Sequence, residues 1–451
     1  MAGRETFSSK LGTLMVLVGS AVGLGNIWRF PFLVGEYGAP FLLCYVLCML
    51  LLSVPILNCE LIIGRFSRSN AYRAYKVHGR RSVWKLAGIL TLIVPFLIFS
   101  YYSVVGGWTL DYLIKSLSFQ FADSSHEQIA AMFGALASHP WLPVVWTLVF
   151  FLATALIVII GVKGGIERFS KYMMPLLFLL IVGLSIWALT LPGASKGLDL
   201  MFNLGATPFG TKTVVAAMGQ AFYSMSLGAG AMITYGSYMA EDEKILSSSI
   251  KTGLFDFLFA VIASMAMLPA TCAFGGDPGQ GAGLAFSTMP MIFASMPCGS
   301  YFAIFFFLAL IIAALTSTAS LFEVNIAFFV EEKKMGRLKA AGIILAGAII
   351  LGSLSSLSFG PLADVKLLGL TFFDLLDQLC ANLLMPLCGL FACLFVGWQM
   401  SWKDVHAELT NHDTLTLPRG VFRLLFILIR YIAPILLILV MVANFLKGGV
   451  A

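Results

Sequence analysis

Long apolar segments alternate with short polar stretches along the whole chain. Each segment is long enough to cross the hydrocarbon core of a bilayer as a helix, which takes about 20 residues. The pattern therefore predicts an all-α polytopic membrane protein with about eleven transmembrane helices. The predicted helices cover residues 11–35, 39–66, 84–116, 143–161, 166–191, 212–240, 247–272, 300–332, 338–356, 369–397 and 419–446.

Two of the predicted helices are interrupted in the middle of the membrane. The helix at 11–35 has three glycines within seven residues, at 19–25, followed by Asn26 and Arg29. The helix at 212–240 contains a run of small and polar residues at 223–230. Non-helical backbone at this depth is tolerated only inside the protein or at a cavity, and intramembrane polar groups mark functional sites. We predict that both helices are broken at a binding site; a glycine-rich packing face is the alternative.

The two interrupted helices occupy corresponding places in two halves of the chain. They are the first and the sixth, so they run across the membrane in opposite directions. Paired interruptions in inverted halves are the best sequence indication of a transporter's central site. We expect one membrane domain over 1–451, with a five-helix repeat at 11–191, an inverted repeat at 212–397 and an additional helix at 419–446.

Composition and charge agree with this class. Hydrophobic residues make up 59% of the chain and charged residues 11%, and the net charge of +6 comes from basic residues between the apolar segments, so no nucleic acid is expected. The loops at 118–141 and 273–300 lack Lys and Arg, whereas 65–85 is basic. The positive-inside rule then predicts a cytoplasmic N-terminus and an outside C-terminus in the cell's inner (plasma) membrane. Whether Cys272 and Cys298 pair stays open.

A broken helix offers two kinds of ligand. Its free N–H groups attract an anion and its free carbonyls attract a cation. Hard oxygen ligands of low charge suit Na⁺, and the scarcity of clustered Cys and His argues against transition metals. The candidate N–H groups are those of Leu24 and Gly25, and the candidate oxygens are the carbonyls of Gly19, Ala21 and Val22, the Asn26 amide and the Thr316 and Ser317 hydroxyls.

Many motifs in order resemble those of the neurotransmitter:sodium symporter family, whose bacterial members have the leucine-transporter fold. The resemblance covers nearly the whole chain. It includes residues 18–31, Pro55 with Glu60, Gly64 and Arg65, Tyr101 and Tyr102 before Trp108, 164–168, 226–228, 314–317, Asp374 to Asp377, and 430–434.

The resemblance implies two Na⁺ sites, an amino-acid pocket and two gates. The first Na⁺ site would consist of Ala21, Asn26, Ser224 and Asp256, and the second of Gly19, Val22, Ala313, Thr316 and Ser317. The substrate would contact Ala21, Gly23, Leu24, Gly25, Ile98, Tyr102, Tyr223, Ser226, Gly228, Ala229, Ser317 and Leu321. Arg29 and Asp377 would form an outer gate above a lid of Tyr102 and Tyr223, and Arg4 and Glu331 an inner gate.

Two departures from familiar members of the family indicate the substrate, and Asp256, at the position of a sodium ligand, bears on the ions. Gly23 stands where amine transporters place an aspartate, which favours an amino acid that brings its own carboxylate. Ala229 replaces a bulky aromatic residue, which favours a large hydrophobic or aromatic side chain. Asp256 supplies a fixed negative charge that would make transport independent of chloride, whereas a packed, protonated carboxyl is the alternative.

Two further features carry expectations of their own. Glu60 is expected to be buried and bonded to the backbone of one of the broken helices. Gly165 and Pro175 indicate either a segment that unwinds to admit water or an ordinary kink.

We conclude from the sequence that the chain imports a neutral amino acid with Na⁺ by alternating access and is not an enzyme, because no nucleophile–base pair or metal cluster accompanies the pocket. The alternative is an amino-acid sensor on the same scaffold, against which the predicted inner gate argues. The expected partners are the amino acid and the bilayer, and the oligomeric state is left open.

Overall fold

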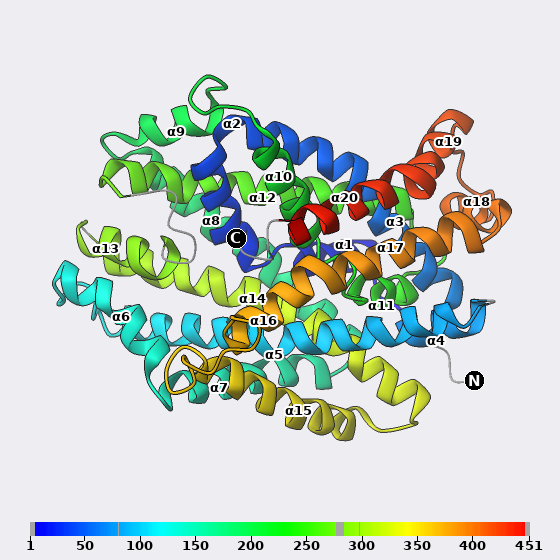
Figure 1. Cartoon of the computed structure of the whole chain (residues 1–451), viewed down its shortest axis with the longest axis horizontal. Helices are drawn as coiled ribbons and strands as arrows, with labels where there is room; N and C mark the ends of the chain where they lie inside the picture. Colours follow the sequence, from blue (N-terminus) through cyan, green and yellow to red (C-terminus); the bar gives the residue numbers. More distant parts are fainter. Residues whose placement is uncertain (1–4, 80, 277–283, 297, 447–451) are drawn as a thin grey trace.

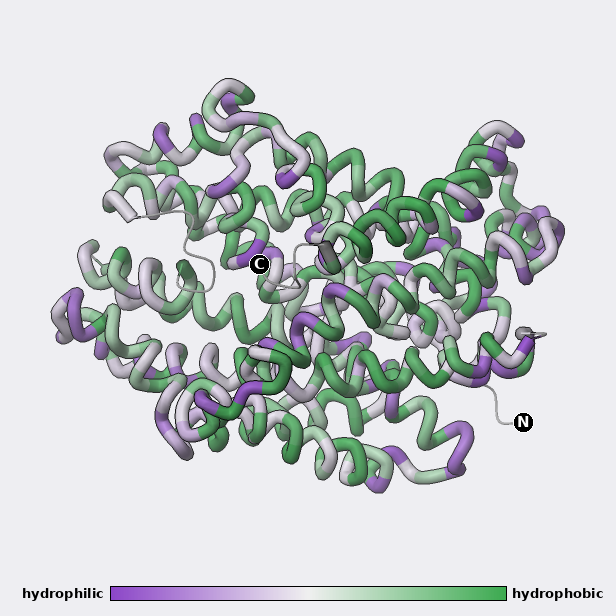
Figure 2. The backbone as a smooth tube through the Cα atoms, viewed as in Figure 1, coloured by the Kyte–Doolittle hydropathy of each residue, from purple (hydrophilic) through white to green (hydrophobic). Residues whose placement is uncertain are grey.

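The computed structural model describes residues 5–446 except 80, 277–283 and 297, and in this part of the chain every regular element is a helix. Figure 1 shows long helices running roughly along one axis, with short helices at both ends. Hydrophobic residues cover the long helices and hydrophilic ones gather mainly toward the ends of the bundle (Figure 2). This distribution is that of a bundle built to cross a bilayer.

The eleven predicted segments correspond to the long helices with ends that differ by four residues or fewer. By length and composition, nine stretches of the described residues qualify as membrane spans. Eight match a single predicted helix each. The first seven of these are α5 (Val83–Leu117), α7 (Leu142–Ile159), η3 with α8 (Val162–Leu189), α12 (Ile245–Ala273), α14 (Gly299–Glu332), α15 (Arg337–Leu357) and α16 to η6 (Phe372–Gln399). The eighth contains α19 (Arg419–Ile427), η7 (Leu428–Ile432) and α20 (Ala433–Leu446).

The ninth stretch, Gly25–Ser67, holds the second part of the first predicted helix and all of the second, joined by a sharp turn. It comprises η1 (Gly25–Arg29), α2 (Phe30–Cys48), η2 (Met49–Ser53) and α3 (Val54–Ser67). The turn lies within α2 at Gly38, whose φ of 62° favours glycine, and Pro40 follows it. A Cβ atom at Gly38 would lie 2.3 Å from the Thr207 hydroxyl oxygen, so the turn is also tightly packed.

The first helix is broken where the sequence predicts it. α1 (Lys10–Ala21) ends at Val22, which has extended backbone angles of φ −75° and ψ 105°, and helical structure resumes after Leu24. A Cβ atom at Gly23 would lie 2.9 Å from the Ser317 hydroxyl oxygen and 3.1 Å from that of Tyr102. The break therefore brings the backbone of this segment close to α14 and α5.

The sixth helix is broken as well. α10 (Thr211–Ser224) and α11 (Ala231–Tyr238) are separated by a segment in which Ser226, Gly228 and Gly230 have φ values of 51°, 77° and 71°. These left-handed angles end the helix, and they favour glycine. The Gly228 N–H donates a hydrogen bond of 2.6 Å to the Glu60 carboxylate, which is 1% exposed. The expectation that Glu60 is buried against a broken helix is confirmed.

The inner end of the fifth helix is tied to the N-terminal segment. Glu167 accepts hydrogen bonds from the Ser8 N–H (2.8 Å) and hydroxyl (2.6 Å). Gly165 lies in the π-helical segment η3, and a Cβ atom there would lie 2.0 Å from the Ile157 carbonyl oxygen. α8 (Arg168–Leu189) continues through Pro175. Close packing thus accounts for Gly165, and unwinding of this segment stays a prediction.

Short helices cap the two ends of the bundle. They are α4 (Ala71–His78), α6 (His126–Ser138), α9 (Ala194–Phe202), η4 (Leu284–Thr288), α13 (Met289–Ala294) and α18 (Trp402–Thr410). Two other short helices, η5 (Leu379–Leu384) and α17 (Met385–Leu394), lie within the tenth predicted helix.

Cys272 and Cys298 are both free thiols, so the disulfide considered for them is not formed.

Candidate functional site

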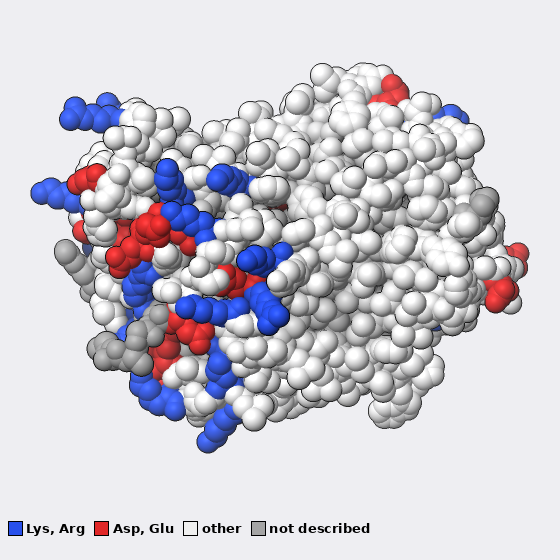
Figure 3. All heavy atoms as spheres, turned by 180° about the vertical axis from the view of Figure 1, so that it is seen from behind, with Lys and Arg blue, Asp and Glu red and all other residues white. Residues whose placement is uncertain are grey.

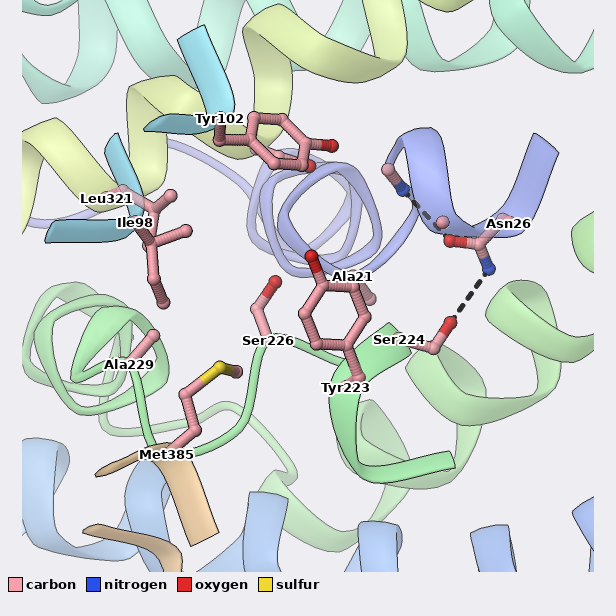
Figure 4. A pocket seen from close by; sticks show the side chains of 13 residues that line it. Ala21, Asn26, Ile98, Tyr102, Tyr223, Ser224, Ser226, Ala229, Leu321 and Met385 are labelled. Carbon is pink, nitrogen blue, oxygen red and sulfur yellow. Dashed lines mark hydrogen bonds between the residues drawn. The ribbon is translucent and has the colours of Figure 1, made fainter. Parts of the chain in front are cut away.

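A cavity of about 40 Å³ lies between the two broken helices, α5, α14 and α17. Figure 4 shows its lining side chains. They are Ala21, Gly23, Gly25, Asn26, Ile98, Tyr102, Tyr223, Ser224, Ser226, Ala229, Ser317, Leu321 and Met385. Ten of the twelve residues predicted for the substrate pocket line this cavity, and the other two, Leu24 and Gly228, are adjacent to it in sequence.

One end of the cavity is lined by polar groups of the broken backbone. The Leu24 N–H donates a hydrogen bond of 2.9 Å to the Tyr102 hydroxyl. The Ser226 hydroxyl donates to the Ser20 carbonyl at 2.7 Å and so joins the two broken helices. Gly23 has no room for a side chain, because Ser317 and Tyr102 occupy that space. This end of the cavity therefore offers hydroxyl and backbone groups, and position 23 contributes no charge.

The opposite end of the cavity is apolar. Ile98 from α5, Leu321 from α14, Ala229 from the break in the sixth helix and Met385 from α17 approach one another there (Figure 4). Their side chains are 5% exposed or less. Because Ala229 has only a methyl group, the Met385 thioether faces the cavity beside it. This arrangement suits an apolar ligand group next to a polar one.

A buried cluster joins the first broken helix to α10 and α12. Asp256 is 0% exposed and accepts hydrogen bonds from Asn26 Nδ2 at 2.7 Å and from the Ser224 hydroxyl at 2.8 Å. The Tyr45 hydroxyl donates to its second oxygen at 2.6 Å. In turn, Asn26 Oδ1 accepts a hydrogen bond from the Gly23 N–H at 3.0 Å. Three of the residues predicted for the first Na⁺ site are thus in direct contact, and Ala21 lines the same cavity.

The residues predicted for the second Na⁺ site lie where α1 meets α14. A Cβ atom at Gly19 would be 3.3 Å from Thr316 Cβ and 3.2 Å from the Met174 sulfur. The Thr316 hydroxyl donates to the Ala313 carbonyl at 3.0 Å. Thr316 thus lies beside Gly19 and Ser317 beside Gly23, and a Na⁺ site formed by these residues with Val22 stays a prediction.

The donors of both clusters suit a hard monovalent cation. The potential metal ligands in both clusters are neutral oxygens, except for the Asp256 carboxylate in the first cluster. Within the part of the chain that the structure describes, no group of three or more His, Cys, Asp or Glu side chains is placed to hold a metal ion. Divalent and transition metals favour more charged or softer ligand sets.

The two predicted gates differ in what the structure shows of them. The Arg29 guanidinium lies over the Tyr223 ring, 4.9 Å from its centroid, and among the described residues no ion pair within 4.0 Å joins Arg29 to Asp377. The guanidinium packs on the aromatic ring in this conformation, and the outer gate of Arg29 and Asp377 stays a prediction. Arg4 lies outside the described residues, and Glu331 accepts a hydrogen bond from the Asn70 N–H at 2.8 Å.

Sequence reasoning missed two residues of the site. Tyr45 bonds Asp256, and Met385 lines the cavity. Both come from long apolar helices in which neither residue stands out. The available signal was weak: Pro386, which is unusual within an apolar helix, directly follows Met385 and lies in the first turn of α17.

Comparisons with known proteins agree with this geometry. The model of the sodium:neurotransmitter symporter family matches residues 4–132 and 141–448. A sodium-dependent transporter of Bacillus subtilis, YhdH, is 37% identical over 438 residues, which cover 96% of each chain. One from Haemophilus influenzae is 32% identical over 98% of each chain. The crystal structure of MhsT in complex with L-phenylalanine superposes with a TM-score of 0.90 at 39% identity, over 98% of this chain and 100% of that one.

Proposed function

The chain belongs to the sodium:neurotransmitter symporter family, whose members are sodium-coupled membrane transporters and not enzymes, and on that premise we propose the substrate and the ions that it carries. The substrate is a neutral amino acid with a large hydrophobic or aromatic side chain. It enters the cell together with two Na⁺ by alternating access, without a requirement for chloride.

The polar end of the cavity supports an amino-acid substrate. A carboxylate there would meet the Tyr102 hydroxyl and the N–H groups of Leu24 and Gly25, where the dipole of the second half-helix favours negative charge. The amino group would meet the carbonyls of Ala21, Tyr223 and Ser226. A side chain at position 23 would crowd the Ser317 and Tyr102 hydroxyls, and glycine there leaves the negative charge to be supplied by the ligand.

The apolar end supports a large side chain, and this is the observation that carries the proposal. Ala229 leaves space in front of Ile98 and Leu321, and Met385 closes the far side. A methionine has three rotatable bonds and a polarisable sulfur, so it adapts to rings of different shape and contacts them favourably. A relative of similar fold has been crystallised with L-phenylalanine, which is an amino acid of this class.

Asp256 supports independence from chloride. Its carboxylate is buried among Tyr45, Asn26 and Ser224, and an isolated buried charge is costly unless a cation or several hydrogen bonds compensate for it. A Na⁺ between Asp256, Asn26 and the substrate carboxylate would balance that charge. The second Na⁺ would bind to Gly19, Val22, Ala313, Thr316 and Ser317, where all ligands are neutral oxygens.

The two halves at 11–191 and 212–397 would move relative to each other around this site, with 419–446 as an addition. Arg29 and Asp377 would close the outer side, and Arg4 and Glu331 the inner side. The N-terminus would lie in the cytoplasm and the C-terminus outside, because the basic loops gather at one end of the bundle.

Equilibrium binding tests the substrate assignment. Purified protein is incubated with radiolabelled phenylalanine in sodium gluconate, and unlabelled amino acids of increasing size compete for the site. We expect phenylalanine and tryptophan to compete far better than alanine or glycine, and binding to vanish when choline replaces Na⁺. A preference for the small amino acids would contradict the proposal.

A further inference from the structure

An amphiphilic groove lies away from the central cavity, between the start of α12 and the segment that joins α18 to α19. Its volume is about 440 Å³. Lys244, Ser247 and Lys251 line it on one side, and Leu409, Leu415 and Leu417 on the other. Leu246, Ile250 and Thr416 complete the lining. The central site uses none of these residues.

The groove lies at the level where two membrane spans begin. α12 starts at Ile245 and α19 at Arg419, and both belong to candidate spans. Beyond the groove each helix exposes a strip of apolar side chains that suits lipid, with Ile250 45% and Leu254 46% exposed on α12 and Leu424 59% exposed on α19. Lysines and arginines gather at this end of the bundle (Figure 3). The position therefore corresponds to the headgroup region of one leaflet.

The carboxylates near the groove have other partners. Asp242 pairs with Lys10 at 2.7 Å, and this contact keeps the pKa of the Asp242 carboxyl below its usual value. Glu243 is 3% exposed and accepts from the Thr13 hydroxyl at 2.5 Å. Three further carboxylates in this region lie near basic side chains: Glu241 is 3.8 Å from Arg68, Glu408 2.7 Å from Arg65 and Asp413 3.5 Å from His406.

Lys244 and Lys251 are left without a counter-ion. Neither forms an ion pair within 4.0 Å with any described carboxylate, and both side chains are exposed. Lys244 directly precedes α12 and has extended backbone angles of φ −89° and ψ 93°, whereas Lys251 lies in the second turn of the helix; both line the groove. A lysine on a lipid-facing helix surface extends toward the headgroups, and two of them frame the space that a phosphate would occupy.

We propose that this groove binds one anionic phospholipid. Its phosphate lies between Lys244 and Lys251, with the Ser247 and Thr416 hydroxyls beside it, and an acyl chain lies along Ile250 and Leu417. Basic pockets at the cytoplasmic side of membrane proteins recognise anionic headgroups, and each lysine near the surface strengthens the attraction on the order of fivefold. The apolar walls favour a lipid over a soluble phosphate.

A fluorescent phosphatidylglycerol titrated into the delipidated full chain in detergent tests the proposal. We expect one saturable site in the wild type, and affinity at least tenfold lower in Lys244→Gln/Lys251→Gln. The matched control is Lys171→Gln/Lys339→Gln, which removes two exposed lysines elsewhere and should bind like the wild type. Melting temperatures in detergent should be equal for all three proteins.

The competing explanations give different results. Equal weakening in both double variants would mean diffuse attraction to a basic surface and would overturn the proposal. Full competition by soluble glycerol phosphate would show that the groove takes a free phosphate and not a lipid. Competition by phosphatidylcholine as strong as by unlabelled phosphatidylglycerol would show that the lysines do not select charge.

Discussion

Asn26 and Asp256 are 230 residues apart in the chain and are joined by a hydrogen bond of 2.7 Å in the middle of the bundle. Asn26 also accepts from the Gly23 N–H, which belongs to the break that lines the cavity. An ion bound to Asp256 would therefore act directly on the backbone segment that is proposed to hold the substrate. This contact gives a physical route by which Na⁺ binding and amino-acid binding strengthen each other.

Replacing Asp256 by Asn removes the buried charge and keeps the shape of the side chain. Uptake in sodium gluconate should fall at least tenfold, because a buried site that loses a charge-assisted interaction loses on the order of 1.5–3 kcal/mol. Chloride should restore part of it, since the Tyr45 and Ser224 hydroxyls remain as donors to an anion. Transport assays in gluconate and in chloride measure both effects.

The control for this variant is Asp111→Asn, which alters a buried carboxylate that bonds Trp146 and Lys115 away from the site. It should transport normally without chloride. Normal transport by Asp256→Asn in gluconate would instead mean that Asp256 is a packed, protonated carboxyl.

Thr316→Val tests the second Na⁺ site. The substitution keeps the β-branched shape but removes the hydroxyl of a residue whose Cβ lies beside Gly19. The Na⁺ concentration for half-maximal substrate binding should rise several-fold, and the Hill coefficient should fall from about two toward one. Thr318→Val is the matched control, because the Thr318 hydroxyl faces Thr154 on α7 at 3.0 Å. If both variants keep the wild-type Na⁺ dependence, Thr316 is not an ion ligand.

Ala229→Phe tests the size of the pocket. A ring at this position fills the space between Ile98, Leu321 and Met385, and overpacking of this kind costs about 1–3 kcal/mol. Affinity for tryptophan and phenylalanine should fall at least tenfold, whereas alanine should bind nearly as before. Competition binding with the four amino acids, including glycine, measures the difference. Equal losses at all sizes would show that Ala229 does not face the substrate.

Tyr102→Phe tests the polar end of the cavity. The loss of one hydroxyl bonded to a substrate carboxylate should weaken binding on the order of tenfold to a hundredfold. Tyr101→Phe makes the same change one residue earlier, where the ring packs against Phe373 at 5.5 Å and does not line the cavity. The dissociation constant should rise in Tyr102→Phe and stay close to the wild-type value in Tyr101→Phe. Similar values would remove Tyr102 from the binding site.

Much of the fold was predictable, because long apolar stretches leave little choice of structure in a membrane. The breaks near Gly23 and Gly228 were visible in sequence for the same reason, since lipid rejects free backbone polar groups. The position of Glu60 followed from the high cost of an unpaired buried carboxylate.

Contacts between helices that are far apart in the sequence were harder to predict. Met385 is one apolar residue among many in its helix, and only folding brings it beside Ala229. The contact of Tyr45 with Asp256 was equally hard to predict, because the sequence around an aromatic residue in an apolar helix does not indicate its hydrogen-bond partner. The distance between Arg29 and Asp377 depends on the conformation, so no sequence pattern fixes it.

Uptake into proteoliposomes tests the central claim most directly. Purified protein is reconstituted, and accumulation of radiolabelled phenylalanine is followed with an inward Na⁺ gradient, with choline in place of Na⁺, and with gluconate in place of chloride. We predict concentrative uptake that requires the Na⁺ gradient and is unchanged by gluconate. Saturable Na⁺-dependent binding without accumulation would identify a sensor, and uptake that needs no Na⁺ gradient would contradict the coupled mechanism.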